Sequence, residues 1–142
     1  MFDATRGYPG EGPESRTSED PSVVLSTANV TAWSSFINQK EFEKGHAVWC
    51  LQETKLWNRT QVRKARAWAA KKGLAAHFSL AVKTPKGGVS GGTAVVWDMQ
   101  RVHFGASLET GSFPSHRATG VLLKVGGLEV EVWSVYGHVD RQ

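Results

Sequence analysis

One short segment constrains the fold more than any other, the run AVWCLQETKLW at residues 47–57. Its first residues are apolar at consecutive positions, which predicts a strand covered on both faces, as parallel strands are. The run then passes through Gln52, Glu53 and Thr54. A carboxylate at the mouth of a buried strand is costly unless it has a partner, and metal ions, bases and substrate phosphates are the usual partners. The segment therefore predicts a buried strand that ends in a candidate functional group.

Composition limits the class of protein. With 142 residues and 40% hydrophobic residues, including six Trp and six Phe, the chain is expected to form one globular domain. Residues 1–21 are rich in Gly, Pro and polar side chains and predict a flexible leader, followed by a domain at 22–142. The leader holds five acidic and two basic residues, a net charge of −3. Because the whole chain has a formal net charge of +4, the remainder carries +7. A basic body favours polyanionic partners, although ordinary soluble surfaces show the same excess.

Strand and helix patterns alternate in the first half of the domain and predict a βαβ order. Beyond residue 73 the pattern is all strand, and Gly126 and Gly127 have the two-residue spacing of a tight hairpin. The second strand of this hairpin is expected to have a wet face with Glu129 and Glu131 and a dry face with Leu128, Val130 and Val132. The fold class is mixed α/β. The expected strands are 22–30, 46–54, 75–82, 92–97, 101–108, 117–125 and 128–137, and the expected helices are 31–42 and 58–72.

The expected helix at 58–72 is strongly basic. Asn58 or Thr60 is a plausible N-cap, and Gly73 stops the helix. The span 55–72 contains seven basic residues and no acidic one. These residues either line a nucleic-acid groove or form an ordinary solvated face. The inward stripe is Val62, Ala65 and Ala69, and the outward basic residues include Arg59, Arg63, Lys64, Arg66, Lys71 and Lys72.

Four segments resemble the motifs of a known family. STANVTAW resembles the first motif of the endonuclease/exonuclease/phosphatase superfamily, in which the opening strand ends in an asparagine. VWCLQETKLW is similar to its second motif, which ends in Gln-Glu-Thr, and GGTAVVW and VEVWSVYGH resemble later strands in the same order. The resemblance extends from Val23 to His138. It implies part of a four-layer α/β sandwich, in which helices flank two packed mixed β-sheets.

The resemblance also implies roles for individual residues. Glu53 and Asn29 would bind the catalytic Mg²⁺ or Mn²⁺, and Tyr136 would contact the scissile phosphate. Magnesium suits such a site because it takes oxygen ligands and keeps several waters, so one or two protein ligands plus substrate phosphate suffice. The implied activity is a metal-dependent phosphodiester hydrolase, nuclease-like, with nucleic acid or another phosphoester as substrate. Arg59, Arg63 and Arg66 are the candidate substrate-binding residues.

Each of these residues also has a purely structural interpretation. Glu53 could be an exposed strand-end carboxylate, Asn29 could cap the following helix, and Tyr136 could be an ordinary strand tyrosine. His138 and Asp140 could form an orienting pair, although a solvated strand end is the simpler interpretation. The remaining histidines show no metal-ligand spacing. The glycine-rich segment 83–93 lacks the Lys-Ser/Thr pair of a phosphate loop and predicts a hairpin connection.

The chain departs from the family at its C-terminal end. The family continues into an Asp-x-Asn motif and a later Asp-His pair, and neither occurs in this sequence. We therefore expect an incomplete and inactive fragment with an exposed apolar sheet face. The alternatives are a non-catalytic nucleic-acid-binding remnant that uses the basic 55–72 helix and an unfolded remnant with no activity.

Cysteine usage and the N-terminus bear on location. Cys50 is the only cysteine and lies inside the apolar run, so it is expected to be a structural buried thiol. The first residues lack the basic start and apolar core of a secretory signal, and no apolar run is long enough to cross a bilayer. The sequence predicts a soluble intracellular protein and does not distinguish nucleus from cytoplasm.

Overall fold

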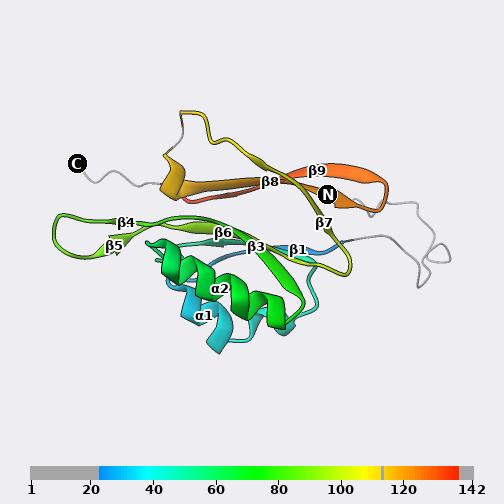
Figure 1. Ribbon diagram of the computed structural model, residues 1–142, viewed down its shortest axis with the longest axis horizontal. Coiled ribbons are helices and arrows are strands. Elements are labelled where there is room, and N and C mark those ends of the chain that lie inside the picture. Colours follow the sequence, from blue (N-terminus) through cyan, green and yellow to red (C-terminus); the bar gives the residue numbers. More distant parts are fainter. Residues whose placement is uncertain (1–22, 113, 138–142) are drawn as a thin grey trace, which may run out of the picture.

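The structure is a computed structural model that describes residues 23–112 and 114–137, and these form three packed layers (Figure 1). Two helices form the first layer, a four-stranded sheet the second and a three-stranded sheet the third. The expected leader at 1–21, together with His138 and Asp140, lies outside the described residues. The mixed α/β class predicted from the sequence is confirmed.

The first sheet is the central layer, and its strand order is β1-β2-β6-β3. Its β1 and β2 strands are parallel, whereas β6 runs antiparallel to both of its neighbours. The buried run that dominates the sequence is β2, and its first four residues are buried, as expected for a strand covered on both faces. The bounds are Leu25–Asn29 for β1, Val48–Gln52 for β2, Leu74–Ser79 for β3 and Thr93–Asp98 for β6.

Helices α1 (Trp33–Asn38) and α2 (Arg59–Lys71) both cover one face of the first sheet (Figure 1). The α2 helix begins at one of the two predicted caps, because the Asn58 side chain accepts a hydrogen bond from the Gln61 amide and the Gln61 side chain accepts one from the Asn58 amide. Its stripe of Val62, Ala65 and Ala69 is buried, and Gly73 follows with a positive φ of 77°. A short 3-10 helix, Glu41–Glu43, follows α1.

The core beneath the helices is aromatic. Trp33 stacks on Phe36 with ring centroids 5.2 Å apart and meets Trp68 edge-on at 5.8 Å. Phe36 is fully buried and contacts Trp49 of β2 edge-on at 5.8 Å. Offset and edge-on ring pairs add to the stabilisation from burial, so this cluster fixes α1 and α2 against the sheet.

The second sheet packs on the opposite face of the first (Figure 1). It is antiparallel in the order β7-β8-β9, with bounds His103–Leu108, Ala118–Val125 and Leu128–Val135. The core between the sheets includes Cys50, Val95, Val121 and Val132. Burial raises the pKa of the Cys50 thiol to about 11, so the thiol stays protonated at neutral pH, as expected for a structural cysteine.

The β8–β9 hairpin matches its prediction only in part. Gly126 and Gly127 form the two-residue connection, and Val125 pairs with Leu128. Val132 is buried as expected for the dry face, but Leu128 is 69% exposed and Val130 is 41% exposed. The expectation that these two residues lie on a dry face was therefore wrong, because the tip of the hairpin has too few packing partners to cover them.

Two further features complete the description. A short hairpin of β4 (Val82–Lys83) and β5 (Val89–Ser90) occupies the glycine-rich segment, as predicted (Figure 1). The second sheet exposes apolar side chains, including Trp133 and Val135. Among the helices that the structure describes, none is both long and apolar enough to cross a membrane.

Candidate active site

The three residues predicted to form the site lie at one edge of the two packed sheets. Parallel pairing places Asn29 directly opposite Gln52 at the carboxyl ends of β1 and β2, and Glu53 follows at once. Tyr136 comes directly after β9, and its side chain lies close enough to Glu53 for the carboxylate to raise the pKa of the hydroxyl. The carboxyl ends of adjacent parallel strands share an edge of the sheet, and β9 adds a residue from the second sheet.

Gln52 joins the two sheets immediately beside this edge. Its side-chain amide donates to Thr27 Oγ1 at 3.1 Å on β1 and to Ser134 Oγ at 3.0 Å on β9. The fully buried Ser134 hydroxyl donates in turn to the Leu51 carbonyl at 2.7 Å. Glu53 and Tyr136 lie one and two residues beyond this bridge. Because a satisfied buried polar network is rigid, the bridge positions Glu53 relative to Tyr136.

The environment of Tyr136 keeps its hydroxyl protonated. The hydrogen bond to Glu53 raises the pKa of Tyr136, with desolvation and the Glu53 charge adding to the effect and Arg117 opposing it. The Arg117 guanidinium lies 5.5 Å from the centroid of the Tyr136 ring, a distance typical of a cation–π contact. The Tyr136 amide donates to the Arg117 carbonyl at 2.8 Å. A neutral tyrosine hydroxyl is therefore present at neutral pH and can donate a hydrogen bond.

The backbone is strained around the site. Glu53 and Lys55 have positive φ values of 62° and 63°, and Thr31, on the facing loop after β1, has a φ of 59°. These three are among the four non-glycine residues with positive φ that the structure describes. Such conformations cost about 1–3 kcal/mol each and gather at functional sites.

The loop that carries Glu53 is held by a pair of glycines. The amide of the buried Thr54 donates to the Gly92 carbonyl at 2.9 Å, and the Lys55 amide donates to the Gly91 carbonyl at 3.1 Å. A Cβ on Gly92 would lie 2.6 Å from Thr54 Oγ1, and one on Gly91 would lie 2.9 Å from the His116 carbonyl oxygen. The Gly-Gly motif thus permits a close backbone approach directly behind Glu53.

Asn29 does not act as a helix cap. The N-cap of α1 is Ala32, which makes no side-chain capping bond, and Asn29 Oδ1 instead accepts from the Thr31 amide at 3.1 Å. The capping interpretation of Asn29 was wrong because two residues intervene between Asn29 and the N-cap. The exposed Asn29 side chain remains at the site edge.

The donor set of the site fits a hard divalent cation. Within residues 23–112 and 114–137, no group of three or more His, Cys, Asp or Glu side chains is placed to hold a metal ion. The edge does offer the Glu53 carboxylate and the Asn29 amide oxygen on adjacent strand ends. Two oxygen ligands are too few for a closed zinc site. They are compatible with Mg²⁺ or Mn²⁺, which retain waters and bind substrate phosphate.

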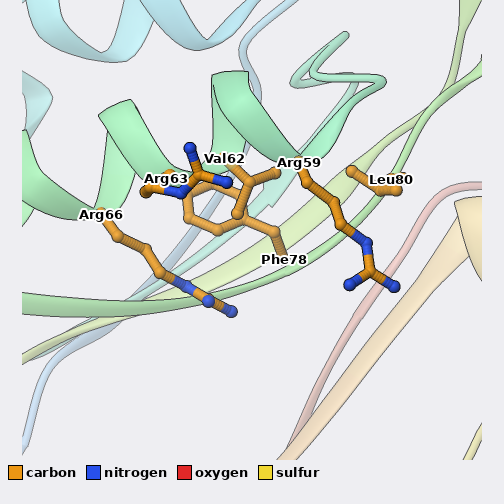
Figure 2. A pocket seen from close by; sticks show the side chains of 6 residues that line it. All are labelled: Arg59, Val62, Arg63, Arg66, Phe78 and Leu80. Carbon is orange, nitrogen blue, oxygen red and sulfur yellow. The ribbon is translucent and has the colours of Figure 1, made fainter.

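The three candidate substrate-binding arginines lie apart from Glu53, on α2. They surround one pocket between α2 and β3, in which Phe78 and the side chains of Val62 and Leu80 provide the apolar surface (Figure 2). The complete lining is Arg59, Val62, Arg63, Arg66, Phe78 and Leu80. The basic side of α2 is therefore more than a flat solvated face, because three of its arginines line a pocket that the sequence did not predict.

Comparisons with known proteins bear on the fold. No protein-family model and no curated protein matches the sequence. Among solved structures, an AP endonuclease from Archaeoglobus fulgidus is similar with a TM-score of 0.50 at 20% identity, covering 75% of this chain and 38% of its own. The APE2 catalytic domain from Xenopus laevis is similar with a TM-score of 0.54 at 18% identity, covering 79% of this chain and 44% of its own. The chain therefore shares its fold with these two nuclease structures.

The fold of these structures is present here in part. The chain spans about two-fifths of the length of these two solved structures. The predicted order of strands and helices is confirmed, and so is the packing of two sheets, with the described helices α1 and α2 outside the first sheet (Figure 1).

Sequence reasoning missed several supporting residues of this superfamily fold. Gln52 and Thr54 were recognised only as parts of a motif, and Ser134 and Arg117 were not singled out. A sequence signal existed for Gln52 and Thr54, because polar residues flank Glu53 at the end of a buried run. No linear signal places Arg117 beside Tyr136, since the pairing of Ala118 with Val135 brings them together.

Proposed function

We propose that Asn29, Glu53 and Tyr136 form the metal-binding and phosphate-contacting part of a metal-dependent phosphodiester hydrolase of the nuclease kind. The observation that carries the proposal is the position of Asn29 and Glu53 at the adjacent carboxyl ends of β1 and β2, with Tyr136 at the end of β9 close enough to Glu53 for the carboxylate to raise its pKa. The superfamily fold supports it. The names of the two similar structures, an AP endonuclease and APE2, favour nucleic acid as substrate.

Each residue has a distinct task in this proposal. Glu53 and Asn29 would hold Mg²⁺ or Mn²⁺, which supplies positive charge to polarise a phosphate oxygen. Tyr136 has a single hydroxyl proton, and it would turn this proton from Glu53 to phosphate oxygens as their charge increases. The Gln52 bridge to Ser134 preserves the spacing of these groups. Arg59, Arg63 and Arg66 attract the polyanionic substrate to the same protein.

These 142 residues are expected to bind metal and phosphate without turnover. The sequence contains no Asp-x-Asn motif and no Asp-His pair, which the family uses to position the nucleophile and leaving group. The second candidate function, non-catalytic nucleic-acid binding through the span 55–72, is favoured by the pocket on α2. Because neither candidate requires turnover by this chain, metal binding separates them better than a cleavage assay.

Thermal unfolding tests the proposal. Saturating Mg²⁺ is expected to raise the melting temperature of the wild-type chain by several degrees, because a ligand that binds only the native state stabilises it, by about 2.7 kcal/mol at a hundred times Kd. Glu53→Gln is expected to lose this rise. Glu129→Gln, which removes the same charge from the exposed hairpin tip, is expected to keep it. An equal rise in the Glu53→Gln and wild-type proteins would contradict a metal site at Glu53.

A further inference from the structure

The pocket beside α2 is a separate feature from the Glu53 edge. It has a volume of about 470 Å³ and lies between the outward face of α2 and the end of β3 (Figure 2). This volume falls within the range of small-molecule sites. In Figure 2 the Arg59 and Arg66 side chains extend on either side of Phe78, and Arg63 lies near the ring.

The charge of the pocket is not neutralised by the protein around it. The guanidinium groups of Arg59, Arg63 and Arg66 have no hydrogen bond or ion pair to any residue that the structure describes. The helix itself contains no acidic residue. Three guanidinium groups around one pocket, with no described carboxylate paired to them, are suited to bind anions, and phosphate matches their planar donor geometry.

The apolar part of the pocket points to more than an isolated phosphate. Phe78 is only partly buried, and one side of its ring meets Trp33 edge-on at 5.3 Å. Leu80 is 37% exposed beside it. An aromatic ring and an exposed leucine between cationic groups provide a platform for a flat apolar group, as in sites where bases stack on aromatic side chains.

The spacing of the arginines fits a chain of phosphates. Positions 59, 63 and 66 fall on one face of a helix, and at 1.5 Å per residue they extend about 10 Å along its axis. Arg59 begins α2 only six positions after Glu53. A bound strand can therefore extend from the neighbourhood of the candidate active site along the helix.

We propose that this pocket binds single-stranded nucleic acid, with Arg59, Arg63 and Arg66 contacting successive phosphates and one unpaired base resting on Phe78 and Leu80. The choice of nucleic acid rests on the proposed function. The pocket itself requires no metal, so its binding is measured in EDTA. A failure at the pocket is then distinguishable from a failure of the metal site.

Fluorescence anisotropy with a labelled oligothymidylate tests the phosphate contacts. Each contact to a single strand contributes about −0.7 to the slope of log affinity against log salt, so the triple variant Arg59→Ala/Arg63→Ala/Arg66→Ala is expected to reduce the slope by about two. The matched control is Lys64→Ala, which removes a charge from the same helix outside the pocket. The triple lysine variant Lys64→Ala/Lys71→Ala/Lys72→Ala is expected to reduce the salt slope by less than half as much as the triple arginine variant does. Equal effects of the two triple variants would overturn the proposal.

The base contact has its own test. Phe78→Leu, which keeps an apolar side chain but removes the ring, is expected to weaken binding about five- to a hundredfold without changing the salt slope. The wild-type chain is expected to bind an abasic oligonucleotide of the same length more weakly by a similar factor, a comparison that needs no variant to fold. Equal affinity for the abasic and thymidine strands, or tighter binding to duplex DNA, would overturn the proposal.

Discussion

Gly92→Ala is expected to destabilise the native state by about 3 kcal/mol or more. Gly92 has a φ of 87°, and an added Cβ would lie 2.6 Å from Thr54 Oγ1, 3.1 Å from the Lys55 amide nitrogen and 3.2 Å from Ala81 Cβ. Thr54 is only 1% exposed and has no room to move away. Backbone strain of about 1–3 kcal/mol is therefore added to overpacking of about 1–3 kcal/mol.

The matched control for this substitution is Gly87→Ala. Gly87 has nearly the same φ, 89°, but no atom lies within 4 Å of the added Cβ. It therefore bears the backbone strain alone, and we expect a loss of about 1–2 kcal/mol. Urea unfolding of the two variants measures the difference. If Gly92→Ala costs no more than Gly87→Ala, the close approach behind Glu53 does not support the loop.

Gln52→Met is expected to cost about 2–3 kcal/mol. The substitution preserves the length of the side chain but removes the donors that reach Thr27 and Ser134. The Ser134 hydroxyl keeps its bond to the Leu51 carbonyl, so the cost comes from the hydrogen bonds that the Gln52 amide no longer donates, at about 0.5–1.5 kcal/mol each. The double variant with Ser134→Ala is expected to be less destabilised than the sum of the single variants, by about 1 kcal/mol, because the two residues share one network.

The exposed Gln100 provides the control for this measurement. Gln100→Met is expected to change the unfolding free energy by less than about 0.5 kcal/mol, as surface substitutions usually do. Urea unfolding measures these free energies. If the changes for Gln52→Met and Ser134→Ala simply add in the double variant, the two residues are not coupled through the inter-sheet bridge.

Local features of the sequence predicted the fold well. Consecutive apolar residues identified β2, and Asn58 and Gly73 identified the ends of α2, because capping depends on residues a few positions apart. The paired glycines identified the β8–β9 hairpin. The resemblance implied a common site for Asn29, Glu53 and Tyr136, and the structure places Asn29 and Glu53 at the adjacent ends of the parallel strands β1 and β2.

Features that depend on distant contacts were not predictable. The role of Gln52 requires Ser134, which lies 82 positions away. The exposure of Leu128 depends on how far the partner sheet extends beneath the hairpin. The pocket on α2 needs Phe78 and Leu80 from the following strand region, and helical periodicity shows only the outward direction of the arginines. Periodicity identifies faces of elements, whereas register and packing decide what those faces meet.

Metal binding at Glu53 is tested most directly by paramagnetic broadening. A ¹⁵N-labelled chain is titrated with substoichiometric Mn²⁺, and amide signals are followed by NMR. The account predicts that signals of Asn29, Glu53 and Tyr136 broaden first, that excess Mg²⁺ restores them, and that Glu53→Gln abolishes the effect. Broadening centred elsewhere in the chain, or broadening at this edge that persists in Glu53→Gln, would contradict it.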